Sequence, residues 1–338
     1  LSANTTGHSN TAIGQAALAT QQAGANYNTG VGYQALYANT TGIENTGLGK
    51  NALVANTTGN SNTAVGADAL VSSTTGDNNT AVGYDALDTN TTASNNTAIG
   101  YIALQAVTTD GNNTALGAYA LRYCTSGNNT AVGTFALEDL TTGTQNAAFG
   151  RNAAMQMTTA NYNTAIGPYA MQEATTCVHG TALGYSAGGS GAMSGGYNTN
   201  IGSGAGANTS TGGSNTAVGY QALNDNTTGA GNVAVGTFAL DANTTANYNT
   251  ALGYQSLSAS TTATGNVAVG YNALAVNTTG ANNTAIGINA LDANTTASHN
   301  VAVGANSLSA NTTATGNAAV GYNALAVNTT GANNTAVG

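Results

Sequence analysis

A short pattern of apolar, small and glycine positions repeats along the whole chain. From Asn79, one unit reads Asn-Thr-Ala-Val-Gly-Tyr-Asp-Ala-Leu-Asp-Thr-Asn-Thr-Thr-Ala-Ser-Asn. The glycine that follows the apolar residue, called the repeat glycine below, occurs twenty times; sixteen of the nineteen spacings are 17 residues, and the others are 18, 16 and 18. So strict a period is typical of stacked repeats. Residues 1–338 are therefore expected to form a single repeat array.

Each unit contains two short segments of strand character. Thr-Ala-Val precedes the repeat glycine and becomes Val-Ala-Val at Val233, Val267 and Val301, with the period of two that a strand requires. The second segment surrounds Ala-Leu. Gly and Asn between the segments suit turns with positive φ, and the Thr, Val, Gly and Asn content disfavours helix. The sequence predicts an all-β protein, a parallel β-solenoid (β-roll) of about twenty coils whose stacking supplies the stability.

Two apolar ladders are expected to fill the inside of the coils. The residue before the repeat glycine is always large and apolar, and Leu stands four residues after the glycine in fifteen of nineteen units. In four consecutive units the predicted core ladder consists of Val82, Ile99, Leu116 and Val132 together with Leu87, Leu104, Leu121 and Leu137.

Small residues accompany both ladders. The residue two before the repeat glycine is nearly always Ala or Gly, and the residue three after it is always Ala or Ser. Uniform smallness at positions expected to face outward indicates that something packs closely against them. Our hypothesis is a second copy of the chain, in a homotrimer. The alternative is that Ala fits a tight turn of a monomer.

Asn-Thr-Thr recurs in the second half of nearly every unit. Stacked from coil to coil, these residues would form Thr and Asn ladders that satisfy the polar groups of the turns. The chain also has seventeen Asn-x-Ser/Thr sequons, eleven of the Asn-Thr-Thr or Asn-Thr-Ser kind and six of the Asn-Asn-Thr kind. An Asn/Thr-rich repeat creates sequons by chance; the alternative is glycosylation of asparagines that face water. The candidates are Asn39, Asn56, Asn90 and Asn277.

Composition excludes several classes of partner. Lys50, Arg122 and Arg151 are the only basic residues, against twelve acidic ones. Phosphate binding requires clustered Lys and Arg, so no nucleic acid partner is expected, nor is an anionic membrane surface. No run of about 18 apolar residues occurs, so no membrane insertion is expected.

No constellation for catalysis, a cofactor or a metal is recognisable. His8, His179 and His299 lie many coils apart and cannot share one metal site within the chain. Cys124 and Cys177 are three coils apart, too far for a disulfide in a regular solenoid. The acidic residues are dispersed, without a calcium-binding repeat. The chain is therefore not expected to be an enzyme.

Two local features depart from uniformity. Tyr follows the repeat glycine in adjacent units only in pairs such as Tyr84/Tyr101 and Tyr254/Tyr271, which predicts local stacking. Residues 188–213 are rich in Gly, and Gly188 and Gly206 replace the ladder Leu. We interpret this segment as a thinner or bulged pair of coils; the alternative is a bend or a lateral contact site.

The unit Asn-Thr-Ala-Val-Gly-Tyr-x-Ala-Leu resembles the head repeats of trimeric autotransporter adhesins. It is still more similar to Asn/Thr/Gly-rich repeats of phage and giant-virus tail fibres and of bacterial surface fibres. The resemblance extends from Asn10 to Gly338. The head-repeat family implies a left-handed, trimeric parallel β-roll. The present unit departs from that family by an Asn-Thr-Thr-Gly insertion, and the sequence shows neither its membrane anchor nor its coiled-coil stalk.

These observations favour a structural fibre shaft of an extracellular filament, a surface fibre or a viral tail fibre. The expected location is extracellular, at a cell surface or on a virion. The chain starts within a coil at Leu1 and stops on a strand at Gly338, without the caps that solenoids need. We therefore expect a segment of a longer chain or filament that self-associates, as a homotrimer or end to end.

Two other functions remain open. The first is an adhesin head that binds a cell-surface or glycan ligand through Thr, Asn and Tyr side chains. The second, more remote, is ice binding through the Thr ladders, although regular Thr-x-Thr ranks are missing.

Overall fold

The chain is an all-β parallel solenoid of about nineteen coils with a 17-residue repeat. The structure is a computed structural model that describes residues 4, 6–189 and 191–338, and no helix occurs among them. Each coil contributes one three-residue strand, which ends just before the repeat glycine. The predicted fold class is confirmed.

The chain divides into two compact units, Leu1–Asn163 (unit 1) and Thr164–Gly338 (unit 2). The strands of unit 1 are β1 (Thr11–Ile13), β2 (Thr29–Val31), β3 (Thr46–Leu48), β4 (Thr63–Val65), β5 (Thr80–Val82), β6 (Thr97–Ile99), β7 (Thr114–Leu116), β8 (Thr130–Val132) and β9 (Ala147–Phe149). The strands of unit 2 are β10 (Thr164–Ile166), β11 (Thr181–Leu183), β12 (Thr199–Ile201), β13 (Thr216–Val218), β14 (Val233–Val235), β15 (Thr250–Leu252), β16 (Val267–Val269), β17 (Thr284–Ile286), β18 (Val301–Val303), β19 (Ala318–Val320) and β20 (Thr335–Val337).

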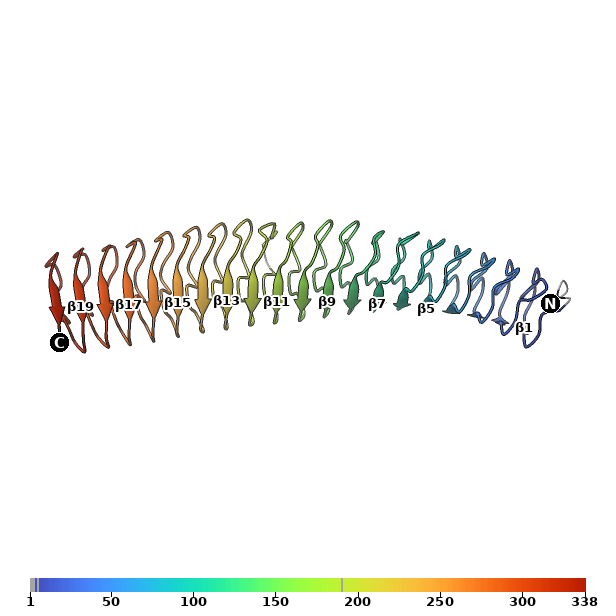
Figure 1. Cartoon of the computed structure of the whole chain (residues 1–338), viewed down its shortest axis with the longest axis horizontal. Helices are drawn as coiled ribbons and strands as arrows, with labels where there is room; N and C mark the ends of the chain where they lie inside the picture. The colour runs from blue at the N-terminus through green and yellow to red at the C-terminus, as the bar shows by residue number, and fades with distance from the viewer. Residues whose placement is uncertain (1–3, 5, 190) are drawn as a thin grey trace. The chain divides into compact units, whose positions relative to one another are not determined.

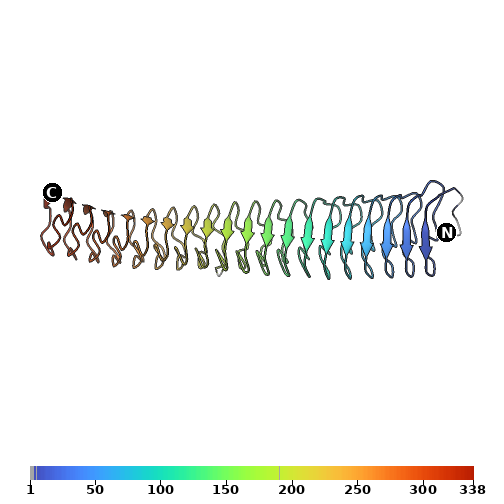
Figure 2. The same ribbon diagram turned by 90° about the horizontal axis from the view of Figure 1, so that it is seen from below.

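Within each unit, consecutive strands pair in parallel and in register. Thr80, Ala81 and Val82 of β5 lie beside Thr97, Ala98 and Ile99 of β6, for example. Figure 1 shows β10–β20 side by side in unit 2, and the blue to green strands of Figure 2 show the same arrangement for unit 1. Equal spacing of the repeat glycines produces this register, because each unit of sequence makes one turn.

The segment around Ala-Leu is a turn, so our prediction of a second strand there was wrong. In the coil of Gly83, Asp85 has φ 52° and Leu87 has φ 55°, both in the left-handed region. This region is unfavourable for Leu. It is maintained because the side chain of Leu87 is buried, and because its N–H donates to the carbonyl of Ala103 in the next coil at 3.1 Å.

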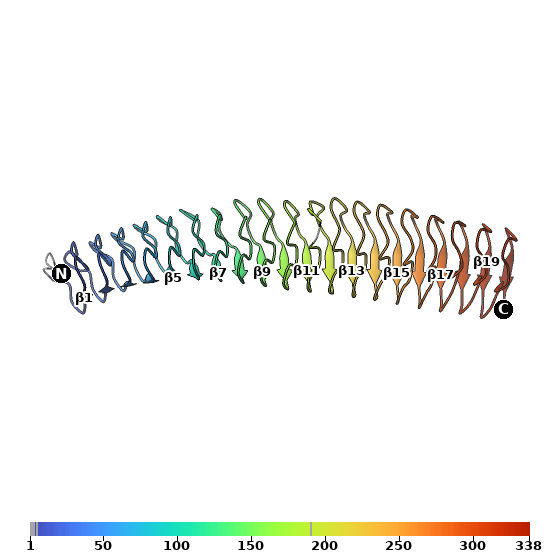
Figure 3. The same cartoon turned by 180° about the vertical axis from the view of Figure 1, so that it is seen from behind.

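The turns are hydrogen-bonded from coil to coil, as the strands are. The N–H of Thr57 donates to Thr74 O at 2.8 Å, and the N–H of Thr74 donates to Thr91 O at 2.8 Å. In Figure 3 the turns that connect β10–β20 also lie in rows, above and below the strands. Each coil is thus bonded along most of its path rather than through the strand alone.

The inside of the coils contains only one of the two predicted apolar ladders. Leu87, Leu104, Leu121 and Leu137 are fully buried. The prediction for Val82, Ile99, Leu116 and Val132 was wrong, because these residues lie on the outer face of the strand: Ile99 is 38% and Leu116 44% exposed, and the two Val residues are half-buried. The inward strand residue is the central Ala, which is fully buried at Ala81 and Ala98.

The thickness of the coil explains this inversion. A Cβ atom added at Gly30, the central residue of β2, would lie 3.2 Å from Ala35 O and 3.3 Å from Leu18 Cγ. The Leu ladder of the opposite wall therefore leaves room for no more than a methyl group at the centre of the strand. A large residue at this position would force the coil open, so the large strand residue must face outward.

The same geometry corrects the expectation that the small residues face a second chain. Ala86, Ala103, Ser256 and Ser307, which stand three residues after the repeat glycine, are fully buried inside their own coils. Their smallness reflects close packing between the two walls of one coil. Any contact between copies must use other residues.

Candidate functional surfaces

A ladder of buried Asn residues runs through each unit, four residues before the repeat glycine. Asn79 donates through Nδ2 to Ala93 O at 2.8 Å and to Asn62 Oδ1 at 3.1 Å, and its Oδ1 accepts the N–H of Asn96 at 3.0 Å. One side chain thus joins three coils and satisfies two backbone groups. Buried polar groups with partners of this kind specify the coil path.

The four predicted glycosylation sites lie in a second buried ladder. Asn39, Asn56, Asn90 and Asn277 are fully buried. The amide nitrogen of Asn56 donates to Asn39 Oδ1 at 2.9 Å and to Gly59 O at 3.1 Å. Of the two alternatives that the sequence left open, the burial favours chance occurrence of these sequons, because in the folded coil the nitrogen that would carry a glycan is enclosed and hydrogen-bonded. The sequon asparagines that are exposed are Asn208, of the Asn-Thr-Ser kind, and all six of the Asn-Asn-Thr kind: Asn78, Asn95, Asn112, Asn128, Asn282 and Asn333.

The predicted Thr ladder is confirmed. Thr57 Oγ1 donates to Thr74 O at 3.0 Å, and Thr74 Oγ1 donates to Thr91 O at 3.0 Å. These hydroxyl groups link neighbouring coils through the backbone, so their hydrogen atoms are directed along the solenoid rather than toward water.

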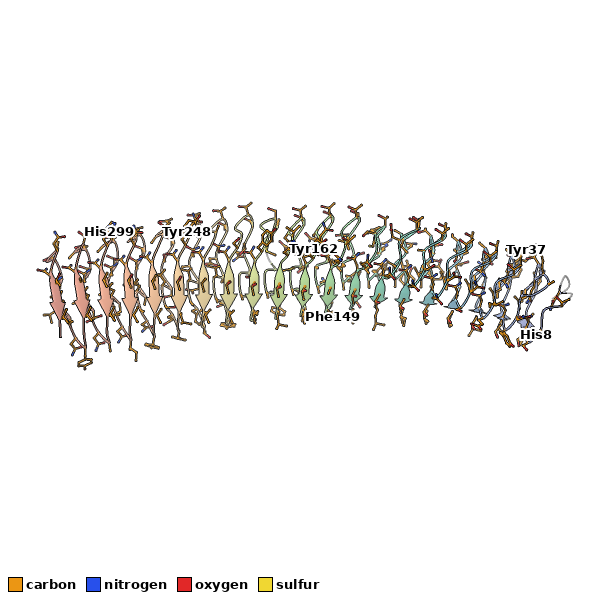
Figure 4. The ribbon with its side chains drawn as sticks, in the orientation of Figure 1. His8, Tyr37, Phe149, Tyr162, Tyr248 and His299 are labelled. Atoms are coloured by element: carbon orange, nitrogen blue, oxygen red, sulfur yellow. The ribbon has the colours of Figure 1, made fainter. Side chains whose placement is uncertain are left out.

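The outer face of the strands carries an uninterrupted apolar row in each unit, here called the outward apolar rank. Its members are the residues immediately before the repeat glycines, and every one is Val, Ile, Leu or Phe. Leu48 is 45%, Leu252 46% and Phe149 40% exposed. In Figure 4, Phe149 lies at the lower edge of its coil in unit 1. Contiguous exposed apolar surface commonly marks an interaction site.

Four aromatic rings form a continuous row in unit 1, here called the aromatic row. Tyr84, Tyr101, Tyr119 and Phe135 belong to four consecutive coils, with successive ring centroids 5.6, 5.3 and 5.2 Å apart. Tyr84 is 47% and Tyr101 46% exposed. The sequence predicted the pair Tyr84/Tyr101; the other two rings were missed because they stand one residue further from the repeat glycine.

Charged side chains gather beside the aromatic row. The guanidinium carbon of Arg122 lies 5.2 Å from the ring centroid of Tyr119 and 4.7 Å from that of Tyr123. Arg122 also forms an ion pair with Glu138, at 3.7 Å. At the other end of the row, the pKa of the Asp85 carboxyl group is raised. Burial is the largest cause, and the negative charges of Asp88 and Asp68 add to it.

Unit 2 contains a second row of four rings at the same place in its coils. The centroids of Tyr220, Phe238, Tyr254 and Tyr271 are 5.4, 6.4 and 5.5 Å apart. No cation–π contact accompanies it among the described residues. It provides an internal comparison for the aromatic row of unit 1.

In the Gly-rich segment 188–213, one interior residue explains the two glycines that replace Leu; Ser190 lies outside the described residues. Asn200 replaces the central Ala of β12 and is 1% exposed. A Cβ atom at Gly206 would lie 2.7 Å from Asn200 Cγ, and one at Gly188 would lie 2.9 Å from Asn200 Nδ2. The larger Asn therefore occupies the space that the Leu side chains fill in other coils, and the two glycines leave it free.

The histidines and cysteines are dispersed. His8 packs edge-on against Tyr27 at 5.2 Å, and His179 stacks on Tyr197 at 5.1 Å. His299 lies on the same edge of unit 2 as Tyr248 (Figure 4). Among the described residues, no three His, Cys, Asp or Glu side chains are placed to hold a metal ion.

Both thiols are buried. Burial raises the pKa of Cys124, and it raises the pKa of Cys177 to about 12. Both groups are therefore protonated near neutral pH, which makes them poor nucleophiles.

Burial also makes the stability depend on pH. It raises the pKa of Asp139, Asp241 and Asp292 above the ordinary value of 3.8. The folded chain then keeps protons that the unfolded chain loses, so stability is fully present below the ordinary pKa and falls as the pH rises through the raised values. We expect a higher Tm at about pH 4 than at about pH 7.5 in circular dichroism melts. The double variant Asp241→Asn/Asp292→Asn should reduce the change of Tm with pH. A Tm that increases with pH over this range would contradict the raised pKa values of these carboxyl groups.

Comparison with known proteins assigns no family. No protein-family model matches the chain, and a search of curated proteins found no significant relative. Within the described residues, no helix has the length and apolar character needed to cross a membrane.

Proposed function

We propose that this chain is a structural shaft segment of an extracellular filament, a surface fibre or a viral tail fibre. The observation that carries the proposal is the repetition of the same coil-to-coil hydrogen bonds throughout each unit. Backbone, Asn and Thr bonds join each coil to the next, as at Asn79 to Asn62 and Thr57 to Thr74. Opening one coil requires several of these bonds to break together, which resists bending and proteolysis.

The absence of a pocket among the described residues also agrees with a mechanical role. The sequence varies little from coil to coil, so no single coil carries a concentrated set of reactive groups. A shaft requires this uniformity, because each repeat must bond equally well to the one above and the one below.

We further propose that the outward apolar rank is the surface through which copies of the chain associate, in a homotrimer or within a filament. Each of the eleven strands of unit 2 presents two outward side chains, the first and third of the strand, giving twenty-two residues. Stable protein interfaces use roughly 20–30 residues a side. None of these strand residues is charged, so two such faces can come together without burying an unpaired charge.

Light scattering with size-exclusion chromatography and electron microscopy of the purified chain test this proposal. We expect a stable oligomer or filaments, and we expect Leu252→Lys/Ile286→Lys to yield monomers with unchanged circular dichroism. The control is Tyr248→Lys, at a 74% exposed ring outside the rank, which should leave assembly intact. A wild-type chain that is a monodisperse monomer would overturn the self-association, and isolated rods without continuation would contradict the filament.

A further inference from the structure

We propose that the aromatic row of unit 1, together with Arg122 and the carboxylates beside it, binds a neutral polysaccharide chain lying along the coils. This binding function goes beyond the mechanical role of a shaft. The site extends over the four coils that contain Tyr84, Tyr101, Tyr119 and Phe135.

The spacing of the rings suits a polymer of hexoses. Successive centroids are 5.2–5.6 Å apart, set by the stacking of the coils. One hexose residue of an extended polysaccharide has nearly this length, so sugar after sugar can meet ring after ring. The axial C–H bonds of a hexose pack against the electron-rich faces of aromatic rings. About half of the surface of Tyr84 and Tyr101 is open to such a contact.

The polar groups beside the rings suit the hydroxyl groups of a sugar. Asp85 and Asp88 belong to the coil of Tyr84, and Glu138 and Asp139 belong to the coil of Phe135. Carboxylates accept hydrogen bonds from hydroxyl groups, and the guanidinium of Arg122 donates to them. Carboxylates outnumber the single guanidinium, so an acidic polysaccharide would be repelled. The charge pattern therefore selects a neutral chain.

Charged residues are concentrated around the aromatic row, and the stacking of its rings does not by itself explain this. Residues 68–139 contain eight of the fifteen charged residues of the protein, counting three basic and twelve acidic ones. Aromatic rings stabilise neighbouring coils wherever they occur, as the second row in unit 2 does without a cation. The open surface, without an enclosing pocket among the described residues, suits an elongated polymer rather than a small molecule.

Calorimetric titration of the full chain with cellohexaose, chitohexaose and a linear mannohexaose tests the proposal, with polygalacturonate as the acidic comparison. We expect at least one neutral hexasaccharide to bind. Tyr84→Ala/Tyr101→Ala should weaken binding by about tenfold or more, the loss expected from two ring contacts. Ala67 and Ala118 stand at the same position in other coils, so the fold already accepts this change.

Two further variants locate the site. Arg122→Gln introduces the residue that the preceding coil carries at the same position, Gln105, and should weaken binding while lowering Tm only slightly, because a partly exposed ion pair contributes little to stability. Tyr254→Ala/Tyr271→Ala removes two rings from the row in unit 2 and should leave binding unchanged. The proposal is overturned if none of the neutral hexasaccharides binds, if polygalacturonate binds more tightly, or if the two double variants have equal affinity. Because oligomer size is measured separately, a monomer that still binds would contradict only the self-association.

Discussion

Replacing Gly219 with alanine is expected to destabilise unit 2 by about 3 kcal/mol or more, because it combines backbone strain with a steric clash. Gly219 has φ 137°, a region that only glycine occupies readily. A Cβ atom there would lie 2.6 Å from Gly236 O and 2.7 Å from Gly236 C, in the backbone of the next coil. The two coils would have to separate, and the bond from Gly236 N to Val218 O, now 2.8 Å, would weaken.

Chemical denaturation of the variant, followed by circular dichroism, measures this effect. The matched control is Gly231→Asn. Gly231 also has a positive φ, 67°, but Asn adopts the same conformation at the equivalent position in other coils, as at Asn282 with φ 58°. The nearest atom to a Cβ atom at Gly231 is Cδ1 of the exposed Tyr248 ring, which can move. Equal stability of the two variants would show that close coil stacking at the repeat glycine is not required.

Replacing Leu104 with alanine is expected to cost about 3–5 kcal/mol, the usual range for removing a fully buried Leu from a rigid core. Leu104 is inaccessible to solvent, and the thin coil has few other side chains that can relax into the space. The same substitution at Leu116, 44% exposed on the outer face of β7, should cost less than about 1 kcal/mol in the monomer. The pair tests the orientation of the strand directly.

Thermal melts measure the loss of stability in both variants. They are recorded at low protein concentration, because association through Leu116 would stabilise the wild type and enlarge the apparent loss in the Leu116 variant. For units of this size, 1 kcal/mol corresponds to about 2–4 °C in Tm. Leu104→Ala should therefore lower Tm by roughly 6–20 °C. A larger loss at Leu116 than at Leu104 would mean that the outward apolar rank is the true core.

The burial of Asn39, Asn56, Asn90 and Asn277 has a signal in the sequence. At the position of Asn39 and Asn56 in their coils, four other coils carry Val107, Cys124, Leu140 and Met157. A position that alternates between Asn and medium-sized apolar residues is one that is enclosed, because water-facing positions do not require apolar substitutes. The structure agrees, since Cys124, Leu140 and Met157 are all fully buried.

The spacing of the repeat glycines alone determined the class of fold. Glycines every 17 residues, with Thr-Ala-Val before them, require one turn per unit and in-register parallel strands, because identical residues then stack on one another. The Leu ladder was also readable, since no other large residue recurs on that wall. The ladders of Asn and Thr followed from the same stacking.

The orientation of the strand was decided only by the tertiary structure. A three-residue strand with period two allows either Ala81 or Val82 to face inward, and both choices give a regular pattern. The distance between the two walls of the coil selects Ala, because Leu from the opposite wall already fills the interior. Likewise, nothing in the local sequence announces that Leu87 adopts a positive φ or that Asn200 occupies the space left by Gly188 and Gly206. These features depend on which atoms meet across the coil, and that proximity exists only after the chain has closed on itself.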